Sequence, residues 1–188
     1  MKSKLNNKRV ISGLLVVLVC AICFMLGKNV VNASEYVDSE TEMMRGGRNS
    51  REKTTVTDAE YRLFVCIVYC EAGGEKYDGQ LGVANVILNR MYGAGWPNTL
   101  YDVIYQKHQF SPVKNGYLNK ALAEYDQGKF NTKWHESCFK AVDDALAGKN
   151  NIGNRMYFMT PKALEQNLGN NYYDKLVIGN TAFFNTNW

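Results

Sequence analysis

Two helical segments separated by a pair of glycines constrain the fold of this chain more than any other feature of its sequence. In residues 67–90, IVYCEAGGEKYDGQLGVANVILNR, apolar side chains recur at helical spacing on both sides of Gly73-Gly74. We therefore expect one helix over residues 58–72 and a second, deeply buried helix over residues 77–92. Glycine tolerates the left-handed turn that closes many helices, so the pair is expected to end the first helix in such a turn.

The remaining sequence predicts shorter helices and a few strands. Helical spacing predicts helices over residues 99–105, 118–127, 132–147 and 161–168, while residues 106–116 are expected to form a loop. RMYFMT and KLVIGNTAFF are typical of strands, and the second segment is expected to turn at Gly179-Asn180. At 188 residues the chain is long enough for one well-buried domain. The predicted fold class is mainly α with a small β-sheet (α+β), in a single domain.

The first 33 residues are expected to lie outside this domain. Basic residues precede 18 uncharged, largely apolar residues from Val10 to Gly27, and small or aliphatic residues follow at the positions that a signal peptidase reads. This pattern indicates an export signal. The length of the apolar run also permits an uncleaved N-terminal membrane anchor, and both alternatives place the rest of the chain outside the membrane.

A polar segment is expected to join this N-terminal region to the domain. Residues 34–56 mix charged side chains with Ser, Thr and Gly and show no sustained apolar period, which is typical of a flexible linker. Thr57 and Glu60 then form a capping box that opens the first helix. The working domain is therefore predicted to span residues 57–188.

The charge distribution argues against a nucleic-acid partner. The chain holds 22 Lys and Arg and 18 Asp and Glu, and its formal net charge is +4. Five of the basic residues and none of the acidic ones fall in residues 1–33, so the remainder carries a net charge of −1. A domain without a basic excess lacks the electrostatic footprint of nucleic-acid binding.

Three cysteines follow the N-terminal segment. Cys66 and Cys70 lie one helical turn apart, which is a poor geometry for a disulfide within a regular helix. Either one could pair with Cys138, or all three could be buried thiols. We favour buried thiols, because free cysteine behaves as a small hydrophobic residue.

Glu71 is an acid at an unusual place. Most carboxylates in the last turn of a helix are solvated or paired with a cation, but Glu71 has apolar neighbours and precedes an apolar helix. Burial and the negative end of the helix dipole both favour its protonated form. A carboxylic acid that keeps its proton near neutral pH is what glycoside cleavage needs.

Four segments of the sequence resemble the cell-wall hydrolase family that includes the spore cortex-lytic enzymes. They are VYCEAGGEKYDGQLGVANVILNRM, WPNTLYDVIYQKHQFSPVKNG, MYFMTP and KLVIGNTAFF, and the resemblance covers about Val65 to Phe184. It implies a lysozyme-like, lytic-transglycosylase-like fold that acts on peptidoglycan glycan strands. It also implies that neither a metal nor another cofactor is required.

The resemblance implies that Glu71 is the catalytic acid. Such an acid protonates the glycosidic oxygen between N-acetylmuramic acid, or its δ-lactam form, and N-acetylglucosamine. The muramoyl 6-hydroxyl then attacks the anomeric carbon, which gives a 1,6-anhydro product. Glu75 is the rival, because a continuous helix would place two carboxylates about 5 Å apart, as retaining hydrolysis needs. The glycines argue against that continuity, so Glu75 is expected to be structural, for example as a cap of the second helix.

Other residues of these segments are candidates for substrate binding. Gln80 and Asn89 could bind sugar hydroxyl or N-acetyl groups, or could tie loops together, whereas Arg90 is expected to be a structural ion-pair partner. The resemblance implies that four further residues line the groove, where aromatic faces suit sugar rings. These four are Phe110, Ser111, Tyr157 and Phe158.

The chain departs from the family pattern at two positions. The family commonly has glycine or alanine where this chain has Cys70, and histidine where it has Thr181. Cys70 could crowd the end of the catalytic helix. Thr181 removes a possible contact in the groove, which leaves binding strength and pH optimum open.

Two other functional classes remain as alternatives. A secreted cysteine peptidase acting on wall peptides would use Cys70 or Cys138 with His108 or His135. Cys138 and His135 alone are too few ligands for a zinc site. A non-catalytic wall-binding module is the other alternative. For each class we expect an exported monomer in the cell wall or spore envelope, with any membrane contact made only by the N-terminal segment.

Overall fold

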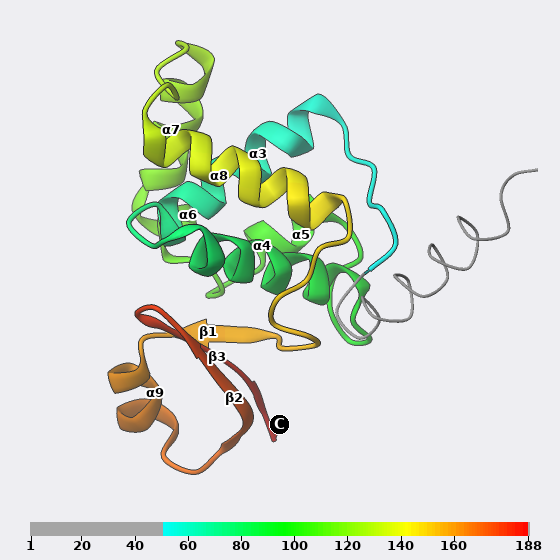
Figure 1. The fold of residues 1–188 in the computed structure, drawn as a ribbon, viewed down its shortest axis with the longest axis vertical. Coiled ribbons are helices and arrows are strands. Elements are labelled where there is room, and N and C mark those ends of the chain that lie inside the picture. Colours follow the sequence, from blue (N-terminus) through cyan, green and yellow to red (C-terminus); the bar gives the residue numbers. More distant parts are fainter. Residues whose placement is uncertain (1–50, 188) are drawn as a thin grey trace, which may run out of the picture. The chain divides into compact units, whose positions relative to one another are not determined.

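The computed structural model describes residues 51–187, so the expected export signal and most of the expected linker lie outside the described residues. The helices are α3 (Asp58–Ala72), α4 (Tyr77–Tyr92), α5 (Leu100–Tyr105), α6 (Ser111–Asn115), α7 (Tyr117–Asp126), α8 (Lys133–Leu146) and α9 (Pro161–Leu168). The strands are β1 (Tyr157–Met159), β2 (Tyr172–Ile178) and β3 (Thr181–Thr186) (Figure 1). The predicted class, mainly α with a small sheet, is confirmed. Within residues 51–187, no helix is both long and apolar enough to cross a membrane.

Helix α3 begins and ends where the sequence predicts. The Thr57 hydroxyl accepts a hydrogen bond from the Glu60 amide, and the Glu60 carboxylate accepts one from the Thr57 amide at 2.9 Å. This reciprocal capping box satisfies two amides that a helix start leaves unpaired. Residues 64–68 are fully buried, because the helix passes through the main hydrophobic core.

Gly73 ends α3 for a different reason from the one predicted. Its φ is −59°, which is right-handed, so the expected left-handed turn is wrong. A Cβ atom built on Gly73 would lie 2.6 Å from the backbone oxygen of Tyr69 and 2.8 Å from its ring. Glycine is therefore favoured here by the close approach of Tyr69, whereas a Cβ on Gly74 would meet open space.

Helix α4 is the central element of the domain, and it is buried from Gly79 to Arg90 as expected. It packs against α3, α5 and α8, and a smaller core cluster joins it to the sheet. That cluster holds Val83 and Val86 of α4 together with Phe183 of β3. A Cβ atom on Gly82 would lie 2.4 Å from the Phe183 ring, so this glycine allows the strand to approach the helix.

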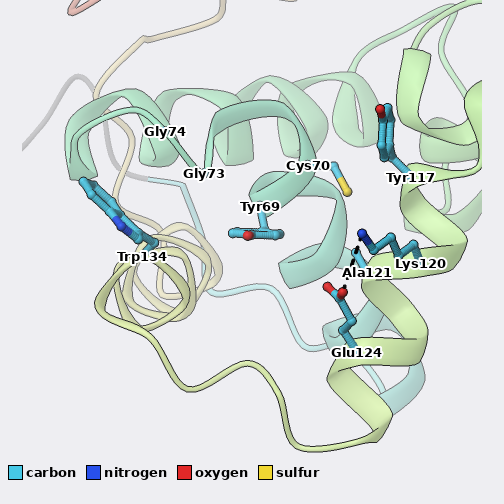
Figure 2. A pocket seen from close by; sticks show the side chains of 9 residues that line it. All are labelled: Tyr69, Cys70, Gly73, Gly74, Tyr117, Lys120, Ala121, Glu124 and Trp134. Atoms are coloured by element: carbon cyan, nitrogen blue, oxygen red, sulfur yellow. Dashed lines mark ion pairs between the residues drawn. The ribbon is translucent and has the colours of Figure 1, made fainter.

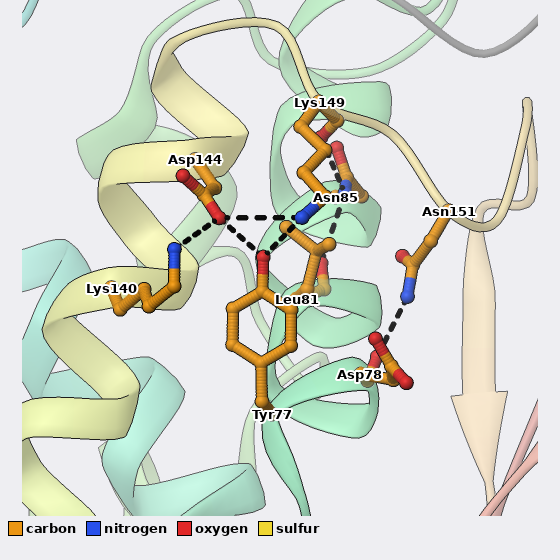
Figure 3. A network of polar contacts seen from close by, with 8 residues as sticks. All are labelled: Tyr77, Asp78, Leu81, Asn85, Lys140, Asp144, Lys149 and Asn151. Carbon is orange, nitrogen blue, oxygen red and sulfur yellow. Dashed lines mark hydrogen bonds and ion pairs between the residues drawn. The ribbon is translucent and has the colours of Figure 1, made fainter.

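A polar network fastens the start of α4 to the end of α8 (Figure 3). The Tyr77 hydroxyl donates a hydrogen bond to the Asp144 carboxylate and accepts one from Lys149 Nζ at 2.8 Å. Lys140 Nζ donates to the same carboxylate at 2.9 Å. These shared contacts lower the pKa of Asp144, chiefly through the hydrogen bonds from Tyr77 and Lys140, and so favour its charged form.

The sheet is antiparallel with strand order β1-β3-β2. The turn between β2 and β3 falls at Gly179-Asn180 as predicted, and Gly179 has a φ of +59° that glycine adopts readily. Leu164 of α9 packs with Ala182 and Phe184 of the central strand. Helix α9 therefore covers part of β3.

The domain begins earlier than predicted. The Arg51 amide donates to the Gly148 carbonyl and the Thr54 amide to the Leu146 carbonyl, both at 2.8 Å. Thr54 is also buried, and its hydroxyl contacts the Tyr92 hydroxyl at 2.9 Å. Residues 51–56 thus belong to the folded unit, and the expected linker cannot extend to residue 56.

One expected loop contains a short helix. Residues 106–116 include α6, in which Pro112 lies in the first turn and Gly116 follows the last residue with a φ of +84°. Proline is pre-set for a first helical turn, and glycine allows the left-handed conformation that ends it. The segment before it, residues 106–110, remains non-helical and shapes the site.

Candidate active site

Glu71 lies in the last turn of α3 and faces a cavity of about 580 Å³. The cavity wall is built from α4, the segment that joins α5 to α6, α6 itself and β1. The lining residues are Glu71, Arg90, Tyr105, Gln106, Lys107, His108, Gln109, Phe110, Ser111, Val113, Lys114 and Phe158. Both the helical core and the sheet are therefore needed to form the site.

Burial gives Glu71 the property that the sequence predicts. It raises the pKa of the Glu71 carboxyl to about 7, while the nearby positive charge of Arg90 acts in the opposite direction. Oxygen Oε1 of Glu71 is buried and has no hydrogen-bond partner within the described part of the chain. The carboxyl group is thus held ready to carry a proton near neutral pH.

Arg90 is buried but is not the ion-pair partner that the sequence predicts. Its side chain is only 3% exposed, its Nε donates to the Met156 carbonyl at 2.7 Å, and no salt bridge to it is found among residues 51–187. The guanidinium lies 4.5 Å from the ring centre of Trp96 and 5.4 Å from those of Phe110 and Tyr157. Aromatic faces rather than a carboxylate hold the cation. Burial also lowers its pKa to about 10.

Gln80 and Asn89 do not line the cavity that holds Glu71. Gln80 is fully buried, accepts from the Ser137 hydroxyl at 2.6 Å and donates to the Glu75 carbonyl at 3.1 Å. Asn89 donates to the carbonyls of Gly153 and Arg155 at 2.8 and 2.7 Å. Their amide groups are engaged inside the domain, and this placement fits the alternative in which they tie segments together.

Three of the four residues expected in the groove line the Glu71 cavity, and one does not. Phe110, Ser111 and Phe158 line the cavity with Glu71, as expected. Tyr157 does not line it, because its ring stacks on Phe184 at a centroid distance of 5.7 Å. Neighbouring strand residues point to opposite faces, so only one of the pair in β1 faces the site.

Glu75 has a structural contact, but it does not cap α4. Its Oε2 accepts from the Asn180 amide in the β2–β3 turn at 3.3 Å. The cap position of α4 is Lys76, which has no capping side-chain hydrogen bond. Glu75 is absent from the wall of the Glu71 cavity, where Glu71 is the only carboxylic acid among the described lining residues. Thr181 is likewise buried at the start of β3, outside that wall.

A second cavity, of about 560 Å³, lies beside the same end of α3 (Figure 2). Cys70 lines it together with Tyr69 and the exposed rings of Tyr117 and Trp134. Burial raises the pKa of the Cys70 thiol to about 11, and the neighbouring Glu71 charge acts in the same direction. A thiol with so high a pKa is protonated at neutral pH and is a poor nucleophile.

The other two cysteines confirm the expected buried thiols. Cys66 and Cys138 are fully buried, and all three cysteines within residues 51–187 are free. Burial raises the pKa of both Cys66 and Cys138 to about 12. In the part of the chain that the structure describes, no group of three or more His, Cys, Asp or Glu side chains is arranged to hold a metal.

Sequence reasoning missed the segment between α5 and α6 as a source of site residues. Gln106, Lys107, His108 and Gln109 all line the Glu71 cavity. His108 has a φ of +67°, in a conformation that few residues other than glycine adopt. The segment lies inside QKHQFSPVKNG, and the signals that could have pointed to it were the break between two helices and its place in a stretch that resembles the family.

The sequence matches the family described as Cell Wall Hydrolase over residues 74–184. Curated relatives include the spore cortex-lytic enzyme of Bacillus cereus, which is 36% identical over 102 residues, and that of Oceanobacillus iheyensis, 32% identical over 134 residues. The matches cover 54% and 66% of this chain, but only 35% and 44% of those relatives. The chain thus matches less than half the length of either protein.

Two solved structures resemble the domain. The catalytic domain of the germination-specific lytic transglycosylase SleB from Bacillus anthracis matches with a TM-score of 0.56 at 29% identity, over 69% of this chain and 96% of that one. The catalytic domain of the Bacillus cereus SleB protein gives the same TM-score and identity, over 73% and 98%. Both similarities support the predicted lysozyme-like fold. With the family match spanning more than half of its residues, the chain belongs to the cell wall hydrolase family.

Proposed function

We propose that this domain cleaves the glycan strands of peptidoglycan as a lytic transglycosylase. The bond cut lies between N-acetylmuramic acid, or its muramic-δ-lactam form, and N-acetylglucosamine. The structural similarity to SleB of Bacillus anthracis, a germination-specific lytic transglycosylase, supports this assignment. The names of the curated relatives, spore cortex-lytic enzymes, support a role in the spore cortex or in cell-wall turnover.

The observation that carries the proposal is a single carboxylic acid in the cavity wall, half-buried as a residue and with its Oε1 fully buried. Glu71 has a pKa raised to about 7 by burial, so a substantial fraction is protonated at neutral pH. The described wall of its cavity contains no second carboxylate that could act as a nucleophile. One acid in such a site suits a reaction in which the substrate supplies its own nucleophile.

The Glu71 carboxyl group acts twice, first as a proton donor and then as a proton acceptor. The protonated carboxyl donates to the glycosidic oxygen as the bond from the anomeric carbon to that oxygen breaks, and the N-acetylglucosamine side leaves as an alcohol. The 6-hydroxyl of the muramoyl residue attacks the anomeric carbon, and its proton passes to the Glu71 carboxylate. The product is a 1,6-anhydro end, and the enzyme regains its starting protonation state.

Attack by water instead of the 6-hydroxyl would make the enzyme a muramidase with a reducing-end product. The position of Glu75 in contact with the β2–β3 turn disfavours it as the base for that water. The cysteine peptidase alternative is disfavoured by the high thiol pKa values of Cys66, Cys70 and Cys138. A non-catalytic wall-binding module would not explain why an ionisable acid is buried in the cavity.

We propose an exported monomer that acts in the cell wall or spore envelope. The apolar run from Val10 to Gly27 supports export, either as a cleaved signal or as an uncleaved anchor. Peptidoglycan lies outside the cytoplasmic membrane, so the proposed substrate agrees with that route. Neither a metal nor another cofactor is needed for the proposed chemistry.

Mass spectrometry of the released muropeptides tests this function. The wild-type protein, Glu71→Gln and the matched control Glu75→Gln would each be incubated with cortex and vegetative peptidoglycan. We expect anhydro-muramoyl ends with the wild-type protein and with Glu75→Gln, and a loss of at least about 100-fold with Glu71→Gln. Reducing ends would indicate a muramidase, and peptide cleavage or an absence of products would contradict the glycosidase assignment.

A further inference from the structure

Three polar atoms around the Glu71 cavity have no partner within the described part of the protein. They are Oε1 of Glu71, Nη1 of Arg90 and Oε1 of Gln106. All three residues line the same cavity, although they come from α3, α4 and the segment after α5. Folded proteins leave few buried polar groups unpaired, because each one has lost its hydrogen bonds to water without replacing them. Three such atoms in one cavity wall indicate groups reserved for a ligand.

The position of Arg90 is fixed by contacts that leave its buried nitrogen Nη1 without a hydrogen-bond partner among the described residues. Nε donates to the Met156 carbonyl at 2.7 Å, and the guanidinium lies near the rings of Trp96, Phe110 and Tyr157. These contacts account for the burial of the side chain, but they provide no acceptor for Nη1. Arg90 therefore presents a fixed donor in a site shielded from bulk water.

Gln106 supplies the complementary group. Its Oε1 is a buried acceptor without a partner among the described residues, and Gln106 follows directly after the last residue of α5. An unpaired donor and an unpaired acceptor in one cavity match a secondary amide, whose carbonyl accepts and whose N–H donates. A carboxylate offers no hydrogen to the Gln106 oxygen, and a hydroxyl would have to make both contacts through one oxygen, whereas a secondary amide makes them through two different atoms.

We propose that Arg90 and Gln106 form a recognition site for the amide carried on the C2 nitrogen of a substrate sugar. Arg90 donates to the amide carbonyl, and Gln106 accepts from the amide N–H. This inference rests on the proposed function, since it places that amide beside the acid that cleaves the strand. Both the N-acetyl group of the ordinary sugars and the lactam of muramic-δ-lactam carry such an amide.

Binding to an inactive protein tests this proposal separately from catalysis. The Glu71→Gln protein would be titrated by NMR with chitotetraose, which has an acetamido group at C2, and with cellotetraose, which has a hydroxyl there. We expect a preference for chitotetraose of about tenfold or more in Kd. Adding Gln106→Leu or Arg90→Lys should reduce that preference to about twofold.

Gln166→Leu is the matched control. Gln166 is an exposed residue of α9 and does not line the Glu71 cavity. It should leave the chitotetraose preference unchanged. Gln106→Leu should also keep or raise the unfolding midpoint, because it removes an unpaired buried acceptor, whereas loss of a structural hydrogen bond would lower it.

The outcomes separate this proposal from the proposed function. Equal affinities for the two tetrasaccharides, no binding of chitotetraose, or a preference that survives Gln106→Leu would overturn the amide site even if the wild-type protein cleaves peptidoglycan. If Gln106→Leu does remove the preference, the rates at which this variant cleaves cortex and vegetative peptidoglycan identify which sugar carries the amide. A larger loss of kcat/KM on cortex would assign the site to the lactam, and a larger loss on vegetative wall would assign it to the N-acetyl group.

Discussion

At the scale of single residues, the environment of Glu71 determines what this acid can do. Burial raises its pKa to about 7, and the positive charge of Arg90 keeps that pKa from rising further. The same cation is held by aromatic rings and a carbonyl, so it does not neutralise the acid through a direct ion pair. The acid is thus poised to give up a proton and to take one back near neutral pH.

This environment predicts how cleavage depends on pH. The first step needs protonated Glu71, so kcat/KM should fall about tenfold per pH unit once the pH exceeds about 7. Initial rates of anhydro-muropeptide release between pH 5 and 9 would measure this, with Glu75→Gln as the control. A rate that stays constant up to pH 9 would show that proton transfer from Glu71 does not limit cleavage.

Stability should depend on pH through the same residue. The folded-state pKa of about 7 lies above the ordinary glutamate value of 4.5, so the neutral form favours the folded state. That contribution is complete below pH 4.5 and is lost as the pH rises through 7. Glu71→Gln should therefore gain about 1–3 kcal/mol of unfolding free energy relative to wild type between pH 4 and pH 8. Urea unfolding at both values measures it, and a constant difference would contradict the buried-acid description.

The sequence predicted the apolar surroundings of Glu71 but misjudged the partners of Arg90, for a physical reason. The apolar context of an acid in a helix is local, so it can be recognised from adjacent residues. The aromatic rings around Arg90 come from Trp96, Phe110 and Tyr157, which only the tertiary structure brings together. Gln106 carries no local signal. It stands out only in the folded protein, where its Oε1 is buried without a hydrogen-bond partner among the described residues.

At the scale of elements, local sequence signals predicted where helices begin and end, but they did not predict which residues pack closely against one another. Both α3 and α4 span the predicted residues, because capping and apolar spacing act within a few residues. The five-residue helix α6 escaped prediction, since it is too short to show a period and its cap residue Phe110 makes no side-chain cap. Gly73 and Gly74 look equivalent in the sequence, although only Gly73 faces Tyr69 closely.

The two adjacent glycines therefore predict different effects of the same substitution. Gly73→Ala would place Cβ 2.6 Å from the Tyr69 carbonyl oxygen and 2.8 Å from its ring, so it should reduce the unfolding free energy by about 1–3 kcal/mol. Gly74→Ala meets nothing within 4 Å and should change it by less than about 0.5 kcal/mol. Urea unfolding of both variants measures the difference, and equal effects would mean that the Tyr69 contact relaxes without loss of stability.

At the scale of the whole domain, residues 51–56 show why the predicted start was too late. They lack apolar spacing and resemble a linker, yet their backbone bonds to residues 146 and 148 at the end of α8. Arg51 also donates side-chain hydrogen bonds to Asn85 and Asn89 of α4. A segment held by such long-range polar contacts has no signature within its own sequence.

Asn89 is the point where these long-range contacts meet. Its side-chain nitrogen donates to the carbonyls of Gly153 and Arg155 at 2.8 and 2.7 Å, and its oxygen accepts from Arg51. Asn89 therefore joins residues 51–56, the central helix α4 and the connection between α8 and β1. Removing its amide takes a partner from the Arg155 carbonyl, and it leaves the Gly153 carbonyl with Asn150 and the Arg51 guanidinium with Asn85.

Asn89→Ala in the full chain should reduce the unfolding free energy by about 2–4 kcal/mol, because several buried groups lose their hydrogen bonds together. Asn115→Ala is the control, since Asn115 makes an exposed contact with the Tyr117 amide, and it should change stability by less than about 1 kcal/mol. Chitotetraose affinity measured below the unfolding transition should be unchanged in both. If Asn89→Ala instead kept its stability and lost affinity, Asn89 would be a sugar ligand, as one of the two sequence-based alternatives holds.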